Sequence, residues 1–152
     1  MKTNHPFLKA SRVCGVQLYK MPSIADDRRG LLTVAEAPST LPFSPKRCFM
    51  IHGIPPGQTR GNHAHKNCAQ LLICPQGECR VHLSDGIHQD EISLTSPDIG
   101  VLVPPMIWAS EHYPTANSIL LVLASHTYEK EDYIHDYAEF LALRKMNRLL
   151  LT

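Results

Sequence analysis

The sequence predicts an all-β fold, an antiparallel β-sandwich or jelly roll, that ends in one C-terminal α-helix. Twelve prolines and eight glycines, all within the first 125 residues, divide that part of the chain into short apolar runs. Strong turn signals separate several of the runs, at Pro55-Pro56-Gly57, Pro75-Gln76-Gly77 and Ser84-Asp85-Gly86. The rest of the chain contains neither glycine nor proline, which favours a helix.

The apolar runs are mostly about four to eight residues long and are bounded by turn residues, which is typical of β-strands. Short strands at this spacing favour an antiparallel sandwich or barrel over a parallel sheet, whose strands are connected by long helices. The expected strands cover residues 13–20, 30–36, 48–54, 69–74, 78–83, 88–94, 100–103, 107–112 and 118–124.

The C-terminal segment is rich in Glu, Ala, Leu, Lys and Arg, so it predicts a helix over residues 129–151. One face of this helix carries a stripe at i, i+3, i+7 spacing, formed by Ile134, Tyr137, Leu141 and Arg144, with Phe140 beside it. We expect the stripe to pack on the barrel or on a neighbouring subunit rather than to form a site.

Length and composition predict one domain that spans residues 1–152. A net charge of +1 indicates neither a nucleic acid nor a membrane surface as partner. No apolar run reaches the roughly 20 residues of a membrane-spanning helix, and the first residues lack the apolar segment of a secretion signal. The five cysteines form no CxxC pair and are odd in number, which favours free thiols in a reducing cytoplasm.

The most informative segment holds two histidines one residue apart, His63 and His65. Side chains alternate along an extended strand, so both imidazoles point to the same face. Two imidazoles on one face indicate a metal site or acid–base chemistry near neutral pH. The pair alone is equally compatible with a surface or structural role. The spacing of the surrounding residues is needed to distinguish such a role from a functional site.

The spacing over residues 57–77 resembles the first motif of the cupins, G-x5-HxH-x3-4-E-x6-G, and the second cupin motif can be laid on residues 98–113. Metal-bearing cupins take their ligands from both histidines, the Glu and a later His. Here Ala69 and Gln70 occupy the acceptable Glu positions and Ala109 occupies the later His position. The ions Fe, Mn and Zn generally need three or four protein ligands. The resemblance therefore implies a cupin jelly roll with metal-free chemistry and no cofactor.

A longer pattern runs through much of the chain, and its most specific combination is RGxHAHK followed about 60 residues later by DYIxDY. The pattern resembles the nucleotide-sugar 3,4-ketoisomerases that act on dTDP-4-keto-6-deoxyglucose, and it covers residues 30–140. It implies a metal-free homodimer that binds a dTDP-linked keto sugar in bacterial deoxysugar biosynthesis, as for lipopolysaccharide O-antigen. The stretches that carry it are RRGLL (28–32), PFSPKR (42–47), RGNHAHK (60–66), GECRV (77–81), VLAS (122–125) and YEKEDYIHDY (128–137).

The reaction of this family suits the histidine pair. Moving a carbonyl from C4 to C3 requires loss of the C3 proton, passage through an enediol or enediolate, and delivery of a proton to C4, while a hydroxyl proton moves between the two oxygens. Groups that titrate near neutral pH serve such transfers best. The resemblance assigns them to His63 and His65. We expect His65 to act at carbon and His63 to carry the proton between oxygens, with the reverse assignment left open.

The same resemblance implies five substrate-binding residues. Arg60 is expected at the pocket mouth, where a guanidinium binds a diphosphate or stabilises an enediolate. Gln70 is expected to face the cavity as a neutral hydrogen-bonding group. Arg47 and Arg80 are candidate partners of the diphosphate, and Trp108 is a candidate wall of the sugar pocket. The alternatives are a solvated turn for Arg60, the protein surface for Arg47 and Arg80, and the core for Trp108.

One residue departs from the family pattern. Family members often carry His directly after the tryptophan, where this chain has Ala109. The departure leaves open a different product stereochemistry or substrate, or a non-catalytic cupin that binds a nucleotide sugar. A 3,5-epimerase on the same substrate class, which is also a metal-free cupin activity, is a second enzymatic alternative. A metal-dependent dioxygenase ranks last, because two of the four metal-ligand positions are lost.

Overall fold

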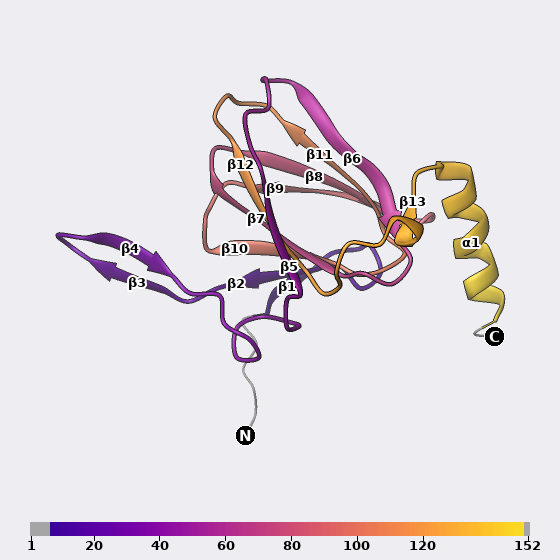
Figure 1. The fold of residues 1–152 in the computed structure, drawn as a ribbon, viewed down its shortest axis with the longest axis horizontal. Helices are drawn as coiled ribbons and strands as arrows, with labels where there is room; N and C mark the ends of the chain where they lie inside the picture. Colours follow the sequence, from indigo (N-terminus) through magenta and orange to yellow (C-terminus); the bar gives the residue numbers. More distant parts are fainter. Residues whose placement is uncertain (1–6, 151–152) are drawn as a thin grey trace.

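The computed structural model describes residues 7–150 and consists of two antiparallel β-sheets, a separate hairpin and a C-terminal helix (Figure 1). The elements are β1 (Phe7–Ala10), β2 (Gln17–Lys20), β3 (Ser23–Asp26), β4 (Gly30–Thr33), β5 (Arg47–Ile51), β6 (Gln58–His65), β7 (Gln70–Gln76), β8 (Cys79–Ser84), β9 (Gln89–Leu94), β10 (Ile99–Val103), β11 (Trp108–Tyr113), β12 (Ile119–Ala124), a short 3₁₀ turn (Lys130–Asp132), β13 (Tyr133–Ile134) and α1 (Tyr137–Leu149).

The two sheets face each other across one apolar core. The larger sheet has the strand order β1-β2-β10-β7-β12-β5, and the smaller sheet has the order β13-β6-β11-β8-β9. Alternate residues of both sheets point inward, as the two-residue period of a strand requires. Leu72 and Val122 enter the core from the larger sheet, whereas Val81, Leu94 and Tyr113 enter from the smaller one. The predicted all-β jelly-roll sandwich is confirmed.

Every strand range expected from the sequence overlaps an observed strand, and the clearest difference lies at the first one. Residues 13–16 form a turn in place of a strand, and β2 begins only at Gln17. Gly15 has a φ of 76°, a conformation that favours glycine and breaks the strand. Four strands lie outside the expected ranges. One is β6, of which only the histidine pair was interpreted as extended chain. The others are the short strands β1, β3 and β13, whose two to four residues carry too little alternation to be recognised.

The predicted helix over 129–151 is wrong at its start, because α1 begins eight residues later, at Tyr137. Asp136 caps the helix, and its side chain accepts a hydrogen bond from the backbone N–H of Glu139. Phe140 of α1 is fully buried against Ala64 and Ile134, so the helix packs on the smaller sheet (Figure 1). Among the described residues, no helix is long and apolar enough to cross a membrane.

Candidate active site

The histidine pair lies at the end of β6, on the inner side of the smaller sheet. His63 lines a cavity of about 400 Å³ between the two sheets. His65 is 6% exposed and lies behind it, with the two ring centroids 5.0 Å apart. Ala64, between them, points the opposite way and packs under α1. The strand thus presents both imidazoles to one side, as predicted.

A β-bulge directly precedes His63 and aims its side chain. Gly61 and Asn62 have φ values of 80° and 57°, both in the left-handed region. The register against β11 shifts at this point, since Ser110 opposes Gly61 whereas Ala109 opposes His63. Bulges of this kind redirect the following side chains and are frequent beside active sites.

Asp132 fixes the orientation of His65. The Nδ1 atom of His65 lies 2.8 Å from a carboxylate oxygen of Asp132, although the residues are 67 positions apart. The same carboxylate accepts hydrogen bonds from the backbone N–H groups of Asn67 (2.7 Å) and Cys68 (3.4 Å). Burial favours a higher pKa for Asp132, but these three bonds outweigh it and lower the pKa. The ionised carboxylate therefore holds the proton of His65 on Nδ1.

This tautomer leaves Nε2 of His65 as an acceptor. The Nε2 atom is buried and has no hydrogen-bond partner in the described part of the chain. Burial also lowers the pKa of His65, and the effect exceeds the opposing pull of Asp132. A neutral imidazole with an unoccupied lone pair is prepared to accept a proton.

A cluster of aromatic rings surrounds the histidine pair. The ring of Tyr133 lies 4.3 Å from that of His65 and 5.1 Å from that of His63, measured between centroids. His135 stacks on Tyr133 at 5.6 Å. Burial, followed by the neighbouring His65, lowers the pKa of His63 from 6.5 to about 4. His63 is therefore a neutral base at physiological pH.

This buried neutral histidine makes the stability of the fold dependent on pH. Below pH 6.5 the unfolded chain takes up a proton at position 63, whereas the folded protein does so only near pH 4. Stability is therefore complete above pH 6.5 and falls by about 3 kcal/mol as the pH approaches 4. Urea unfolding at pH 7 and pH 4 should show this loss in the wild type and in His82→Asn, but a smaller loss in His63→Asn. An equal loss in His63→Asn would contradict the assignment.

Three of the expected substrate-binding residues lie at or beside this cavity. Gln70 and Arg60 line it directly. Arg47 lies beside it, with its guanidinium 3.4 Å from the hydroxyl of Tyr133 and 5.5 Å from the ring centroid of Tyr128. The Nε atom of Arg47 is buried without a hydrogen-bond partner among the described residues. Two cations and one amide thus lie close to the histidine pair.

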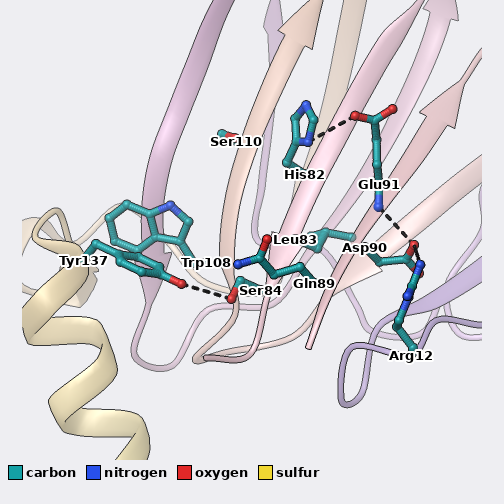
Figure 2. A pocket seen from close by; sticks show the side chains of 10 residues that line it. All are labelled: Arg12, His82, Leu83, Ser84, Gln89, Asp90, Glu91, Trp108, Ser110 and Tyr137. Carbon is teal, nitrogen blue, oxygen red and sulfur yellow. Dashed lines mark hydrogen bonds and ion pairs between the residues drawn. The ribbon is translucent and has the colours of Figure 1, made fainter. Parts of the chain in front are cut away.

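The structure does not bring Arg80 and Trp108 to the cavity. Cys79 and Val81 point into the core, so Arg80 between them points outward and pairs with Glu78. Ala109 is packed against the core, so Trp108 before it also points outward, where its ring packs against Tyr137 at 5.0 Å. Figure 2 shows Trp108 beside Tyr137 in a second, open groove on the outer face of β8, β9 and β11.

Four residues of the site were not predicted from the sequence: Glu111, Asp132, Tyr133 and His135. Three of them belong to the stretch YEKEDYIHDY, which was recognised as part of the family pattern but was expected to be helical. Glu111 follows Ala109 by two residues on β11 and therefore shares its inward face. This two-residue spacing from Ala109 is the signal by which Glu111 could have been predicted.

The positions that hold a metal ion in metal-bearing cupins are only half filled with ligands. His63 and His65 keep their imidazoles, whereas Gln70 offers a neutral amide and Ala109 a methyl group. A second grouping, His65, Cys68 and Asp132, has ligand atoms within 4.8 Å of one another. Within this grouping, the Nδ1 atom of His65 already donates a hydrogen bond to Asp132. The residues therefore fit proton transfer better than metal coordination.

Comparison with known proteins identifies the family of this chain. The model of the FdtA family, described as "WxcM-like, C-terminal", matches residues 14–145. The TDP-4-oxo-6-deoxy-alpha-D-glucose-3,4-oxoisomerase of Aneurinibacillus thermoaerophilus is 41% identical over 114 residues, which is 75% of this chain and 82% of that protein.

Solved structures give the same relationship. A 3,4-ketoisomerase from Helicobacter canadensis has a TM-score of 0.82 at 34% identity, over 86% of this chain and 98% of its own. A mutant of the 3,4-ketoisomerase QdtA from Thermoanaerobacterium thermosaccharolyticum, in complex with TDP-4-keto-6-deoxyglucose, has a TM-score of 0.85 at 34% identity, over 88% and 96%. An epimerase from Mycobacterium tuberculosis, at 17% identity and a TM-score of 0.70 over 82% and 70%, shares the fold. The chain belongs to the FdtA, WxcM-like family of sugar 3,4-ketoisomerases.

Proposed function

We propose that the protein converts TDP-4-keto-6-deoxyglucose to the 3-keto isomer by metal-free proton transfer. The observation that carries the proposal is one neutral histidine at the cavity wall, backed by a second that a buried carboxylate orients. Relatives that are 34–41% identical are named for 3,4-isomerisation, and one was solved with this keto sugar. The 3,4-ketoisomerase class predicted from the sequence is thereby supported.

The placement of the histidines favours the reverse of the roles expected from the sequence. His63 lines the cavity, whereas His65 lies behind it against Asp132. Both histidines must contact the sugar in this reaction, and His63, which lines the cavity, is the better placed of the two to reach the carbon atoms. In our proposal, His63 takes the C3 proton, the electron pair forms the C3–C4 enediolate, and His63 returns a proton to C4. His65, with its free Nε2 lone pair, carries the hydroxyl proton from O3 to O4 before the C4 proton is delivered.

The cations near the cavity support a substrate with a diphosphate. Arg60 lines the cavity and Arg47 lies beside Tyr133. Guanidinium groups bind phosphate oxygens through paired hydrogen bonds. Gln70 offers both a donor and an acceptor to the sugar hydroxyls. We propose that these three residues hold the substrate with C3 against His63.

The product of one reaction tests the proposed function. The purified protein is incubated with TDP-4-keto-6-deoxyglucose in D2O, and the sugar is followed by NMR. We expect the carbonyl group to move from C4 to C3 of the sugar and deuterium to be incorporated at C4. Deuterium at C3 and C5 with the carbonyl retained at C4 would identify a 3,5-epimerase. Binding of TDP without any new sugar would identify a non-catalytic binding protein.

We further propose that the protein is a homodimer held by the β3–β4 hairpin. The hairpin pairs with no other strand in the described part of the chain and projects away from both sheets (Figure 1). Ile24, Leu31 and Leu32 on it are 60%, 71% and 61% exposed. An isolated two-stranded hairpin is marginally stable in water, so burial against a second copy explains its apolar residues.

A charge on this hairpin should separate the subunits. The wild type is expected at about twice 17.0 kDa in size-exclusion chromatography with light scattering. Leu32→Asp should shift it to the monomer mass, because the apolar contact would then bury a carboxylate. Ile87→Asp is the matched control, since Ile87 is equally exposed at 63% but lies outside the hairpin. A monomeric wild type, or a dimeric Leu32→Asp variant, would refute this interface.

We also propose that residues 1–152 form a single domain that works in the cytoplasm. One core joins both sheets, which supports the single domain. All five cysteines are free thiols, three of them buried, as is usual in a reducing compartment.

A further inference from the structure

The cavity contains an acidic residue to which the reaction proposed above gives no role. Glu111 points inward from β11 and lines the cavity together with His63 and Arg60. It is 7% exposed. No other side chain of the described residues donates a hydrogen bond to its carboxyl group. The hydrogen bond given for this carboxyl group comes from its own backbone N–H, and a buried carboxyl with so few partners is costly to a fold and is most often retained for function.

Gly61 makes room for this carboxyl group. A Cβ atom at position 61 would lie 2.6 Å from an Oε atom of Glu111 and 3.1 Å from the carbonyl oxygen of Ala109. The glycine also has a φ of 80°, which other residues rarely adopt. The β-bulge that aims His63 thus opens the space that Glu111 occupies, and the carboxyl group lies against the β6 backbone beside His63.

The surroundings favour the neutral form of this carboxyl group. The titratable groups around it, from β6, β8, β11 and β13 with the loop after it, are Arg60, His63, Cys79, Tyr113, Tyr133 and His135. Burial raises the pKa of Glu111, whereas the positive charge of Arg60 and the backbone N–H of Glu111 itself lower it. Burial is the larger effect and raises that pKa to about 7. At the same pH His63 is a neutral base, so the cavity holds an acid and a base together.

We propose that Glu111, as a neutral carboxylic acid, donates a hydrogen bond to the sugar oxygen that becomes negatively charged in the enediolate. An ionised carboxylate at this place would repel that oxygen, whereas a carboxylic acid stabilises it. The O–H proton stays on Glu111 while charge develops, so the reaction remains balanced with the proton transfers of the two histidines. The inference rests on the proposed function and adds a substrate-contacting catalytic residue to it.

Substitution of Glu111 separates its hydrogen bond from its titration. In wild type, kcat/KM should fall about 100-fold from pH 6 to pH 9 as Glu111 ionises. Glu111→Gln keeps a donor that does not titrate, so it should retain activity within about 10-fold at pH 6 and lose this alkaline decline. Glu111→Leu removes the donor, so its kcat should lie about 100-fold below the wild-type value at pH 6 and should show no alkaline decline. Glu91→Gln, on the outer sheet face, should behave as wild type.

Infrared spectroscopy tests the neutral acid without turnover. A wild-type-minus-Glu111→Gln difference spectrum at pH 6 should show the carbonyl band of a protonated carboxyl group, and the band should vanish by pH 9. Its absence at pH 6, an unchanged alkaline decline in Glu111→Gln, or full activity in Glu111→Leu would each overturn the proposal. A wild type that forms no 3-keto sugar would instead refute the proposed function. The infrared band would in that case still report whether the Glu111 carboxyl group is protonated.

Discussion

Replacing His63 with asparagine is expected to lower kcat by about 10³-fold, because positioned acid–base groups contribute about 10²–10⁴-fold to proton-transfer steps. Asparagine is polar and of similar width near the backbone, but its amide does not accept a proton from carbon. The nucleotide should still bind, since the arginines are untouched. Calorimetry with TDP and NMR of the sugar measure the two effects separately. His82→Asn is the matched control, because His82 lies on the outer sheet face (Figure 2).

Comparison with His65→Asn tells which histidine acts at carbon. If His63 removes the C3 proton, His63→Asn should stop deuterium exchange at C3 of the substrate in D2O. His65→Asn should still exchange that proton but form little product, because transfer between the two oxygens is impaired. Exchange that persists in His63→Asn and stops in His65→Asn would restore the roles expected from the sequence.

The fold could be predicted because its signals are local. Turn dipeptides and short apolar runs determine where most strands begin and end, and the two-residue spacing of His63 and His65 places both on one face. The same alternation also separates Trp108 from the cavity, since the motif puts Ala109 at an inward position. Substrate binding was expected for Trp108 from the residue type and the resemblance, without applying this parity.

The rest of the site depends on contacts between distant segments. Asp132 and Tyr133 reach the histidines across more than 60 residues, and no local pattern reports such a contact. The segment that contains them has a helical composition, but Asp132 is already used by His65, Asn67 and Cys68. Tertiary hydrogen bonds therefore outweigh helix propensity in this segment, and α1 begins only after the last of its site residues.

The second large effect is expected at Asp132, and its direction follows from the bonds of its two oxygens. One oxygen accepts from the backbone N–H of Asn67, and the other accepts from Nδ1 of His65 and from the N–H of Cys68. In Asp132→Asn the amide nitrogen must replace one of them and faces a donor in either place. The shorter bond, to Asn67 at 2.7 Å, keeps the amide oxygen. The amide nitrogen then faces His65.

That orientation reverses the tautomer of His65. Its Nδ1 atom would accept from the new amide, and its proton would move to Nε2, so the free lone pair disappears. We expect kcat to fall by about 10²–10⁴-fold, by analogy with the tautomer change at the His of a serine protease triad. The unfolding free energy should fall by about 1–3 kcal/mol, because the N–H of Cys68 loses its acceptor.

Asp136→Asn is the matched control for this variant. Asp136 caps α1 through one backbone N–H, and asparagine caps helices equally well, so stability and kcat should stay near wild type. Asp132→Asn should bind TDP normally, which separates an altered histidine from a lost pocket. Since the lowered pKa of Asp132 stabilises the fold only above the ordinary carboxyl pKa, the wild type should lose that stability as the pH falls below about 4, and the variant should not. A variant with wild-type kcat would show that His65 works without its carboxylate.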